Sequence, residues 1–279
     1  MSDLLSRSSE HWSEAGRAGM EAFYTLATDD YRHLAQARDW RALFEKGQQR
    51  VGDRPLHLLD VACGSGKFPR ALSHHCSLAD AAIQPVETTL LDPSAFSINE
   101  ARSALEPPFS PVAEVEATLQ DFRPPETGYD IVWATHALYA IPQHELAAAL
   151  TQFLAAIAPG GLGIIAHSAE AGHYVRFHQH YLAAFGEAQT RPYVSAETIV
   201  EMLRALGASV DVQEVRYDSV ASIDQGSAVE GFLQRCVFDD RIDLSQMQAT
   251  EPLASYLAGC GDSGAWRFGQ RVWLITVAG

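Results

Sequence analysis

Short apolar segments alternate with helical segments along residues 56–168, and this alternation constrains the fold more than any other feature of the chain. Apolar runs of this kind, separated by amphipathic helices, are typical of parallel sheets that helices cover on both faces. The expected strands lie in segments 56–62, 87–92, 112–122, 128–137, 162–168, 209–215 and 271–278. The sequence therefore predicts an α/β protein with a doubly wound, seven-stranded sheet.

Charge and cysteine usage limit the classes of partner. The chain has 20 Lys and Arg residues against 35 Asp and Glu residues, a formal net charge of −15. This balance disfavours nucleic acid and anionic membranes as partners and suits a neutral or cationic small molecule. No apolar run is long enough for a membrane span, and no signal peptide is recognised. Four scattered cysteines predict free thiols and a cytoplasmic location, and the oligomeric state stays open.

The segment LLDVACGSGKF (58–68) ends a strand, turns at Gly64 and Gly66, and begins a helix. Such a turn lets backbone N–H groups approach a ligand closely, because glycine has no Cβ. A P-loop would need glycine where Val61 stands, and a dinucleotide-binding loop would need a third glycine where Pro69 stands. Both of these phosphate-binding sites are therefore disfavoured.

The stretch from Asp60 to Gly66 instead resembles the first motif of the class I S-adenosylmethionine-dependent methyltransferases, with Ala62 in place of the first glycine. The resemblance covers most of residues 56–168. It implies a Rossmann-like sheet, mostly parallel with an antiparallel last strand, and S-adenosylmethionine as cofactor. Asp92 would bind the ribose hydroxyls, since a carboxylate accepts from two hydroxyls at once. The cofactor-binding residues that the resemblance implies are Asp60, Ala62, Gly64, Gly66, Asp92, Pro93, Ser94, Gln120, Asp121, Phe122 and Thr135.

Two of these assignments have alternatives that the sequence leaves open. Asp92 precedes Pro93 and a predicted helix, so it could cap that helix with or without binding ribose. Asp121, with Phe122, would hold the adenine, but an acid after a strand is also common on protein surfaces. No metal is predicted, because the spacing of the histidines at 173, 178 and 180 does not suit a metal site.

A thinner resemblance, to the histamine N-methyltransferases, extends over nearly the whole chain. It rests on segments 90–102, 137–141, 193–207 and 231–238. It implies a small-molecule acceptor, an amine or a heterocyclic nitrogen, in a site walled by aromatic side chains. An N-terminal acid, Asp29 or Asp30, would hold the amine.

Apolar residues at helical spacing over 1–50, with a break at Gly52 and Pro55, predict an N-terminal helical lid (1–50) on a methyltransferase domain (51–279). Acceptor-covering insertions are expected around 169–195 and 219–268. His136 stands where this family has an amide, and a histidine has a pKa suited to removing a proton. The expected catalytic residues are His136, Tyr139 and His167. The expected substrate-binding residues are Phe23, Tyr24, Tyr139, Tyr174, Phe232, Trp266 and Gln270.

Three functional readings remain open at this point. Nitrogen methylation of a small molecule is favoured. An O- or carboxyl methyltransferase would need a base such as His136 or His167 beside the acceptor oxygen. A non-catalytic, cofactor-binding regulatory protein would bind the cofactor without an acceptor cavity. Phe177 and Tyr181 could line the acceptor site or belong to a core. Aromatic side chains at helical spacing belong more often to a core.

Overall fold

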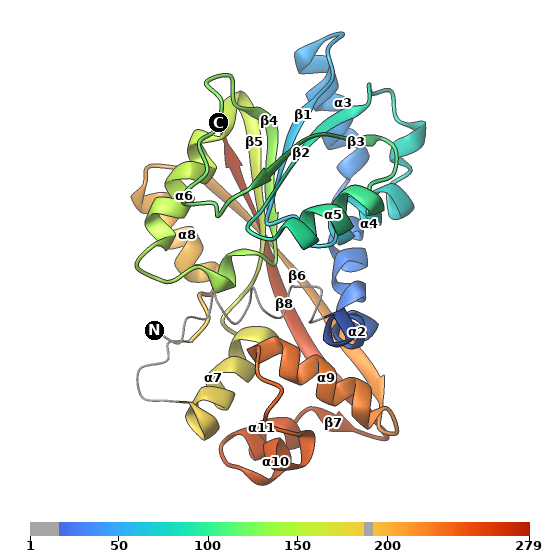
Figure 1. Ribbon diagram of the computed structural model, residues 1–279, viewed down its shortest axis with the longest axis vertical. Helices are drawn as coiled ribbons and strands as arrows, with labels where there is room; N and C mark the ends of the chain where they lie inside the picture. The colour runs from blue at the N-terminus through green and yellow to red at the C-terminus, as the bar shows by residue number, and fades with distance from the viewer. Residues whose placement is uncertain (1–16, 187–191) are drawn as a thin grey trace.

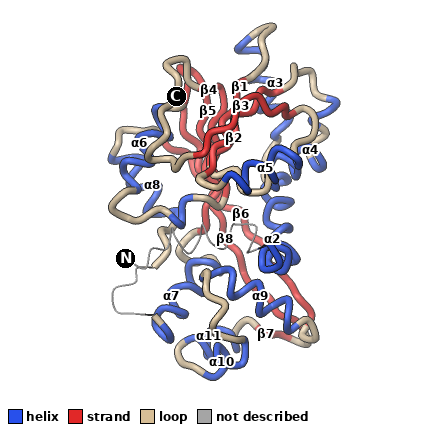
Figure 2. Tube along the Cα trace, viewed as in Figure 1, coloured by secondary structure: helices blue, strands red, loops and turns tan. Residues whose placement is uncertain are grey.

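The computed structural model describes residues 17–186 and 192–279, which fold around one mixed β-sheet (Figures 1 and 2). The sheet order is β3-β2-β1-β4-β5-β8-β6, with β7 paired to β8 at the side. β1 to β5 run parallel, and β8 is antiparallel to both β5 and β6. The strands are β1 (His57–Val61), β2 (Val86–Asp92), β3 (Phe109–Glu116), β4 (Tyr129–Thr135), β5 (Ile157–Ser168), β6 (Val210–Ser222), β7 (Gly261–Asp262) and β8 (Ala265–Ala278).

This arrangement confirms the predicted α/β fold class, including the antiparallel last strand; the two-residue β7 is the addition to the seven expected strands. Helices cover both faces of the sheet (Figure 1). The helices are α2 (Arg17–Gln36), α3 (Trp40–Val51), α4 (Lys67–His75), α5 (Ala95–Ala104), α6 (Leu146–Ala155), α7 (His173–Phe185), α8 (Ala196–Ala205), α9 (Gly226–Val237), α10 (Leu244–Ala249) and α11 (Leu253–Ala258). Two short 3-10 turns are η2 (Leu78–Asp80) and η3 (Leu138–Ala140).

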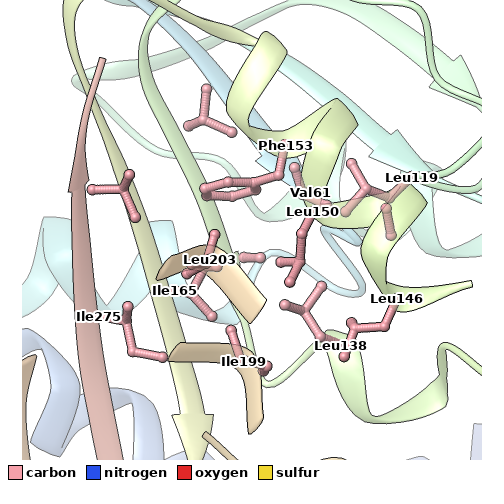
Figure 3. Packing of buried hydrophobic residues seen from close by; sticks show 14 of the residues in the cluster. Val61, Leu119, Leu138, Leu146, Leu150, Phe153, Ile165, Ile199, Leu203 and Ile275 are labelled. Carbon is pink, nitrogen blue, oxygen red and sulfur yellow. The ribbon is translucent and has the colours of Figure 1, made fainter. Parts of the chain in front are cut away.

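The two faces of the sheet bury separate cores, because successive side chains of a strand point to opposite faces. Leu59 of β1 packs in the core under α6 and α8, where Leu150 and Phe153 meet Ile199 (Figure 3). The neighbouring Leu58 packs in the opposite core, under α2, α3 and α4. Both faces of the central strands are therefore closed to water, and ligands have access only at the strand ends.

β6 and β8 are longer than the strands beside them and extend past the sheet as a two-stranded ribbon (Figure 1). Their pairing runs to Ser222 and Ala265, whereas β5 pairs with β8 only as far as Val272. A third core, around Phe177 and Phe232, lies between this ribbon and a group of helices that consists of α7, α9, α10, α11 and part of α2. This helical group stands beyond the carboxyl ends of the parallel strands, and it forms one wall of the cavity described below.

One predicted boundary is wrong. The strand expected at 162–168 begins earlier in the structure, since β5 starts at Ile157, shortly after α6 ends at Ala155, and includes the Pro-Gly-Gly sequence 159–161. The cause is a strand pairing that local sequence does not show, because Ile157 already pairs with Tyr129 of β4. None of the described helices is both long and apolar enough to span a bilayer.

Candidate active site

A partly open cavity of about 190 Å³ lies at the carboxyl ends of β1, β2, β4 and β5. The strand order reverses between β1 and β4, and ligands of doubly wound sheets bind where such a reversal opens a crevice. The loops after these strands form one half of the cavity wall. Side chains from α2, α7 and α9 form the other half.

The loop after β1 is shaped by residues in the left-handed region. Ala62, Gly64 and Gly66 have φ angles of 51°, 52° and 66°. A Cβ on Gly66 would lie 3.1 Å from the Cα atom of Ala101, so glycine is required where α4 starts against α5. Ala62 and Gly64 line the cavity, whereas Gly66 lies behind it and holds the turn.

Asp92, at the end of β2, is fixed by two backbone donors. Its Oδ2 accepts from the N–H of Gly64 at 3.1 Å, and its Oδ1 accepts from the N–H of Ser94 at 2.9 Å. Burial raises its pKa to about 6, and the two backbone hydrogen bonds partly offset this. The hydroxyl of Ser97 also bonds to this carboxylate, whose two oxygens accept about four donors in all, so a ribose hydroxyl can still bind there.

The N-cap of α5 is Ser94, whose side chain accepts from the N–H of Ser97. Asp92 therefore does not cap this helix itself, although it supports the turn before it. Pro93 and Ser94 line the cavity beside Asp92, as does Thr135 at the end of β4. All three are among the residues predicted to bind the cofactor.

Asp60, the last polar residue of β1, is 2% exposed and lines the same cavity. Its Oδ2 has no hydrogen-bond partner among the described residues. Burial raises its pKa to about 7, Trp133 partly offsets this effect, and the nearby Asp92 adds to it. A buried carboxylate oxygen without a donor is costly, so this site fits a ligand that brings a cationic or hydrogen-bonding group.

Of the residues expected to contact the adenine, only some line the cavity. Gln120 lines the cavity, and its amide donates to Glu145 at 2.7 Å. Asp121 is exposed outside the cavity and accepts a hydrogen bond from the hydroxyl of Thr118. Phe122 is buried in the core under α6. The described residues that wall the cavity here are Ala117, Thr118, Leu119, Gln120, Leu138 and Ile141.

Aromatic side chains wall the other end of the cavity. Of the predicted substrate-binding residues, the structure brings Phe23, Tyr24, Tyr139 and Tyr174 to the cavity. It adds three that the sequence analysis missed, namely Tyr31, Tyr193 and Phe238. No local signal marks these three, because they come from a helix, a loop and a helix C-terminus that only the tertiary fold brings together.

Asp30 of α2 is the acid at this aromatic end. It is 2% exposed, and its Oδ2 accepts a hydrogen bond from the hydroxyl of Tyr174. The hydroxyls of Tyr217 and Ser219 also lie near this carboxylate, but no described residue makes a hydrogen bond of good geometry to its Oδ1. Burial raises its pKa to about 7, and Tyr174, Tyr217 and Ser219 partly offset this effect.

Asp29, the alternative acid, faces the outside of α2. It pairs with Arg32 at 2.5 Å and with His33 at 3.1 Å, and it does not line the cavity. The structure therefore brings only Asp30 to the aromatic end.

His136 and His167 both line the cavity. His136 follows β4 with a φ of 51°, and its Nε2 has no partner among the described residues. Burial lowers its pKa to about 3 and that of His167 to about 4. The Nε2–H of a neutral His167 donates to the carbonyl of Val194 at 2.9 Å, which leaves Nδ1 as an acceptor. Both imidazoles are neutral at physiological pH and are weak bases there.

The remaining predicted substrate residues lie elsewhere. Phe232 and Trp266 are buried in the core of the helical group. Gln270 is buried behind the cavity, where its amide donates to the hydroxyl of Ser219 at 3.2 Å. Within residues 17–186 and 192–279, no three His, Cys, Asp or Glu side chains are arranged to hold a metal ion.

Comparisons with known proteins agree with this geometry. A family model described as a methyltransferase domain matches residues 29–213. No curated protein sequence matches the chain. The thinner resemblance to histamine N-methyltransferases therefore receives no support from these comparisons.

Solved structures with the same fold are distant in sequence. A Bacillus halodurans protein described as a putative methyltransferase has a TM-score of 0.55 and 13% identity over 85% of this chain and 98% of its own. The magnesium protoporphyrin IX methyltransferase of Synechocystis, crystallised with S-adenosylhomocysteine, has a TM-score of 0.56 and 12% identity over 99% of this chain and all of its own. At these identities the likeness concerns the fold alone. With more than half of the chain matched by the family model, the protein belongs to the methyltransferase domain family and is an S-adenosylmethionine-dependent methyltransferase.

Proposed function

We propose that this enzyme methylates a nitrogen of a small, planar molecule that binds at the aromatic end of the cavity. The observation that carries the proposal is the position of Asp30. A buried carboxylate with an unpartnered oxygen lies among aromatic side chains, in the same cavity that Asp92 lines. Aromatic faces and a carboxylate together favour a cationic or proton-donating nitrogen.

The cofactor half follows from the residues already placed. We propose that Asp92 binds the ribose diol, that Ala62 and Gly64 offer backbone groups, and that Asp60 faces the positively charged amino-acid part. Thr118, Leu119 and Gln120 would then contact the adenine in place of Asp121 and Phe122. When bound, S-adenosylmethionine supplies an electrophilic methyl group, and the electron pair of the broken C–S bond stays on sulfur.

The protein's own residues position the acceptor and remove one proton from its nitrogen. An amine reacts through its lone pair, so an ammonium must first lose a proton. Asp30, with a pKa of about 7, accepts that proton more readily near neutral pH than His136, whose pKa is about 3. The proposed roles are therefore Asp30 as proton acceptor and the neutral His136, Tyr139 and His167 as positioning groups. Residues 17–50 and the helical group on the β6–β8 ribbon would cover the acceptor.

The first test separates cofactor binding from acceptor binding. Calorimetric titration with S-adenosylmethionine should give a complex that Asp92→Ala weakens by at least about tenfold, since a bidentate charge-assisted contact is lost. Asp121→Ala is the matched control, and its affinity should equal that of the wild type. Equal affinities of the wild type and Asp92→Ala would remove the ribose assignment.

The second test concerns the acceptor. A product-mass screen over amines, phenols and carboxylic acids should yield methylated amines, and Asp30→Asn should lower their turnover without changing cofactor affinity. Methylated phenols or carboxylic acids alone would indicate oxygen transfer instead. Tight cofactor binding with no product from any class would favour a regulatory protein.

A further inference from the structure

An open groove of about 620 Å³ lies beside the edge of β8. β5 pairs with β8 as far as Val272, and β7 pairs with it at Ala265 and Trp266. Within the described part of the chain, the stretch 267–271 therefore has a free edge on that side. Residues of this stretch line the groove, together with the beginning of α7 and the segment that leads from α11 to β7. No described residue lines both the groove and the cavity, so the groove is a separate candidate site.

The backbone of Gly269 faces this groove. In an antiparallel strand the N–H and C=O groups of one residue point to the same side, and the side alternates from residue to residue. The N–H of Arg267 donates to the carbonyl of Cys260 at 2.7 Å, and the carbonyl of Arg271 accepts from the N–H of Ala169 at 2.8 Å. Gly269 lies midway between these two arginines and lines the groove, so its N–H points to the same edge and offers a donor to a ligand.

The groove is lined by positive charge. Its arginines are Arg176 of α7, Arg216 of β6, and Arg267 and Arg271 of β8. Among the described residues of its wall, Asp218 is the one acid. The whole chain has only 20 Lys and Arg residues against 35 Asp and Glu residues. Four arginines around one groove therefore concentrate positive charge on a molecule that is negative as a whole.

The acids beside the β-strands neutralise this charge only in part. Arg216 and Arg271 are direct cross-strand partners, a position in which like charges destabilise a sheet. The carboxylate of Glu214 pairs with both of them, at 2.5 Å and 3.9 Å. Arg267 lies 4.0 Å from Asp218, at the limit of an ion pair. Two carboxylates thus face three guanidinium groups on the ribbon, and an anion in the groove would relieve the remaining repulsion.

The beginning of α7 adds donors from the other side. Arg176 lies 5.3 Å from the ring centroid of Tyr256 and has no described acid within ion-pair distance. The N-cap residue is Gly172, which has no side-chain oxygen to offer to the first N–H groups of the helix. His173 is 1% exposed and lines the groove, and its Nε2 has no partner among the described residues. Its Nδ1 lies 2.8 Å from the hydroxyl of Tyr256; when that hydroxyl donates, Nε2 carries a proton and can donate to a ligand.

We infer that this groove is a second ligand site, which binds the phosphate group of a small phosphorylated molecule. A phosphate ester carries up to two negative charges and three acceptor oxygens, so it can accept from donors that converge from several directions. The helix N-terminus, the N–H of Gly269 and the guanidinium groups are donors of this kind. The groove has the volume of a small-molecule site and is larger than a bare anion needs, which leaves space for the organic part of the ligand. The inference goes beyond the proposed function and does not depend on it.

The first test uses inorganic phosphate as the probe. It is titrated calorimetrically into the wild-type protein saturated with S-adenosylhomocysteine, so that the cofactor half of the cavity is already filled. One phosphate should bind per chain. Succinate, a dianion whose two carboxylates are planar, is the comparison, and it should bind about tenfold more weakly because each of its charged groups accepts in one plane only.

The second test removes one cation at a time. Arg176→Gln and Arg271→Gln change opposite sides of the groove, and each should weaken phosphate binding by about tenfold, since a charge-assisted hydrogen bond is lost. Neither change leaves an acid without a partner, because Arg176 has no acidic partner and Glu214 keeps Arg216. Arg204→Gln is the matched control. It removes the same charge from the exposed side of α8, outside the groove, and should leave the affinity within about twofold.

Several results would overturn the inference. Absence of binding at millimolar phosphate would remove the site, and binding that occurs only without S-adenosylhomocysteine would place the anion in the cofactor cavity. Succinate that binds as tightly as phosphate would exclude a phosphate-selective site. An unchanged affinity in Arg176→Gln or in Arg271→Gln, with folding confirmed by circular dichroism, would exclude a site formed by both sides of the groove. A loss in Arg204→Gln as large as in these variants would indicate a general attraction of charge. The amine screen tests the proposed function separately, and its result does not alter any of these.

Discussion

Replacing Asp30 with asparagine should stabilise the protein at neutral pH while impairing its activity. Burial raises the pKa of Asp30 to about 7, from the ordinary aspartate value of 3.8. The folded state therefore favours the protonated acid, and the stability that this group contributes is present below pH 4 and is lost as the pH rises through 7. The difference of about 3 pH units, at about 1.4 kcal/mol each, corresponds to about 4 kcal/mol above pH 7.

An asparagine has nearly the same shape and no charge to bury, so the Asp30→Asn variant does not carry this pH-dependent cost. Its oxygen can still accept the hydrogen bond from Tyr174. The stability of the variant minus that of the wild type should increase by about 2.5 kcal/mol between pH 5 and pH 8.5. If the amide forms poorer hydrogen bonds than the acid, the stability of the variant falls by the same amount at every pH. The quantity to measure is therefore the change of the stability difference with pH.

The assay is urea denaturation followed by circular dichroism, without ligands, at several values between pH 5 and pH 8.5. Asp60 and Asp92 also titrate in this range, but they contribute equally to both proteins and cancel in the difference. Asp29→Asn is the matched control, because this neighbouring acid is half-exposed and its pKa is lowered by the hydrogen bond from Arg32. Its removal should cost less than about 1 kcal/mol, with only a small pH dependence above pH 5, which arises because Asp29 raises the pKa of His33.

A difference between Asp30→Asn and the wild type that stays flat from pH 5 to pH 8.5 would refute this reasoning. It would mean that water or a movement of α2 relieves the buried charge. The proposed role in proton transfer would then lose its basis, since that role requires a pKa near neutrality.

Three further variants test other parts of the structure. Gly66→Ala should lower the free energy of unfolding by about 1–3 kcal/mol, because it adds backbone strain and a clash with α5. Gly207→Ala is the control, since Gly207 also has a positive φ but has open space around it, and it should lower the free energy of unfolding by less. Equal losses of the two variants in denaturation would contradict the clash. Asp130→Asn should lower the free energy of unfolding by about 2 kcal/mol at pH 7, because Arg54 and Arg50 help to hold the pKa of Asp130 at about 2. This loss should shrink as the pH falls below 4. A loss at pH 3 as large as that at pH 7 would contradict the lowered pKa. His136→Asn should fold normally, since asparagine tolerates a positive φ. It should lower turnover without shifting the apparent pKa of the pH–rate profile. A shifted pKa would identify His136 as the base.

The cofactor half could be predicted from the sequence because its determinants are local. Asp60, Gly64 and Gly66 lie within seven residues, and Asp92 ends the next strand along the chain. A parallel sheet then brings the ends of adjacent strands together without further information. The prediction failed at Asp121, where the turn after β3 directs that side chain outward and leaves Thr118 to Gln120 on the cavity.

The acceptor half could not be predicted in the same way. Asp30 and Arg235 are 205 positions apart in the chain, and both line the cavity because α2 and α9 pack against each other. Helical periodicity identifies a buried face but does not distinguish a core from a cavity. Phe232 shows the consequence: it was expected to bind substrate, yet it lies in the core, while Arg235 on the same helix lines the cavity.

The three acids of the cavity lead to a last prediction, about protons and cofactor binding. Asp30, Asp60 and Asp92 line the cavity with pKa values raised by burial to about 7, 7 and 6, so they are partly protonated at pH 6.5. A cation that binds beside a carboxylate lowers its pKa. S-adenosylmethionine carries a positive sulfonium that S-adenosylhomocysteine lacks. At pH 6.5, its binding should release on the order of one proton, and more than the homocysteine product releases. Calorimetry in two buffers of different ionisation enthalpy measures this number. At pH 8.5 the release should vanish, because all three acids are already ionised; a release that persists there would have to come from other groups.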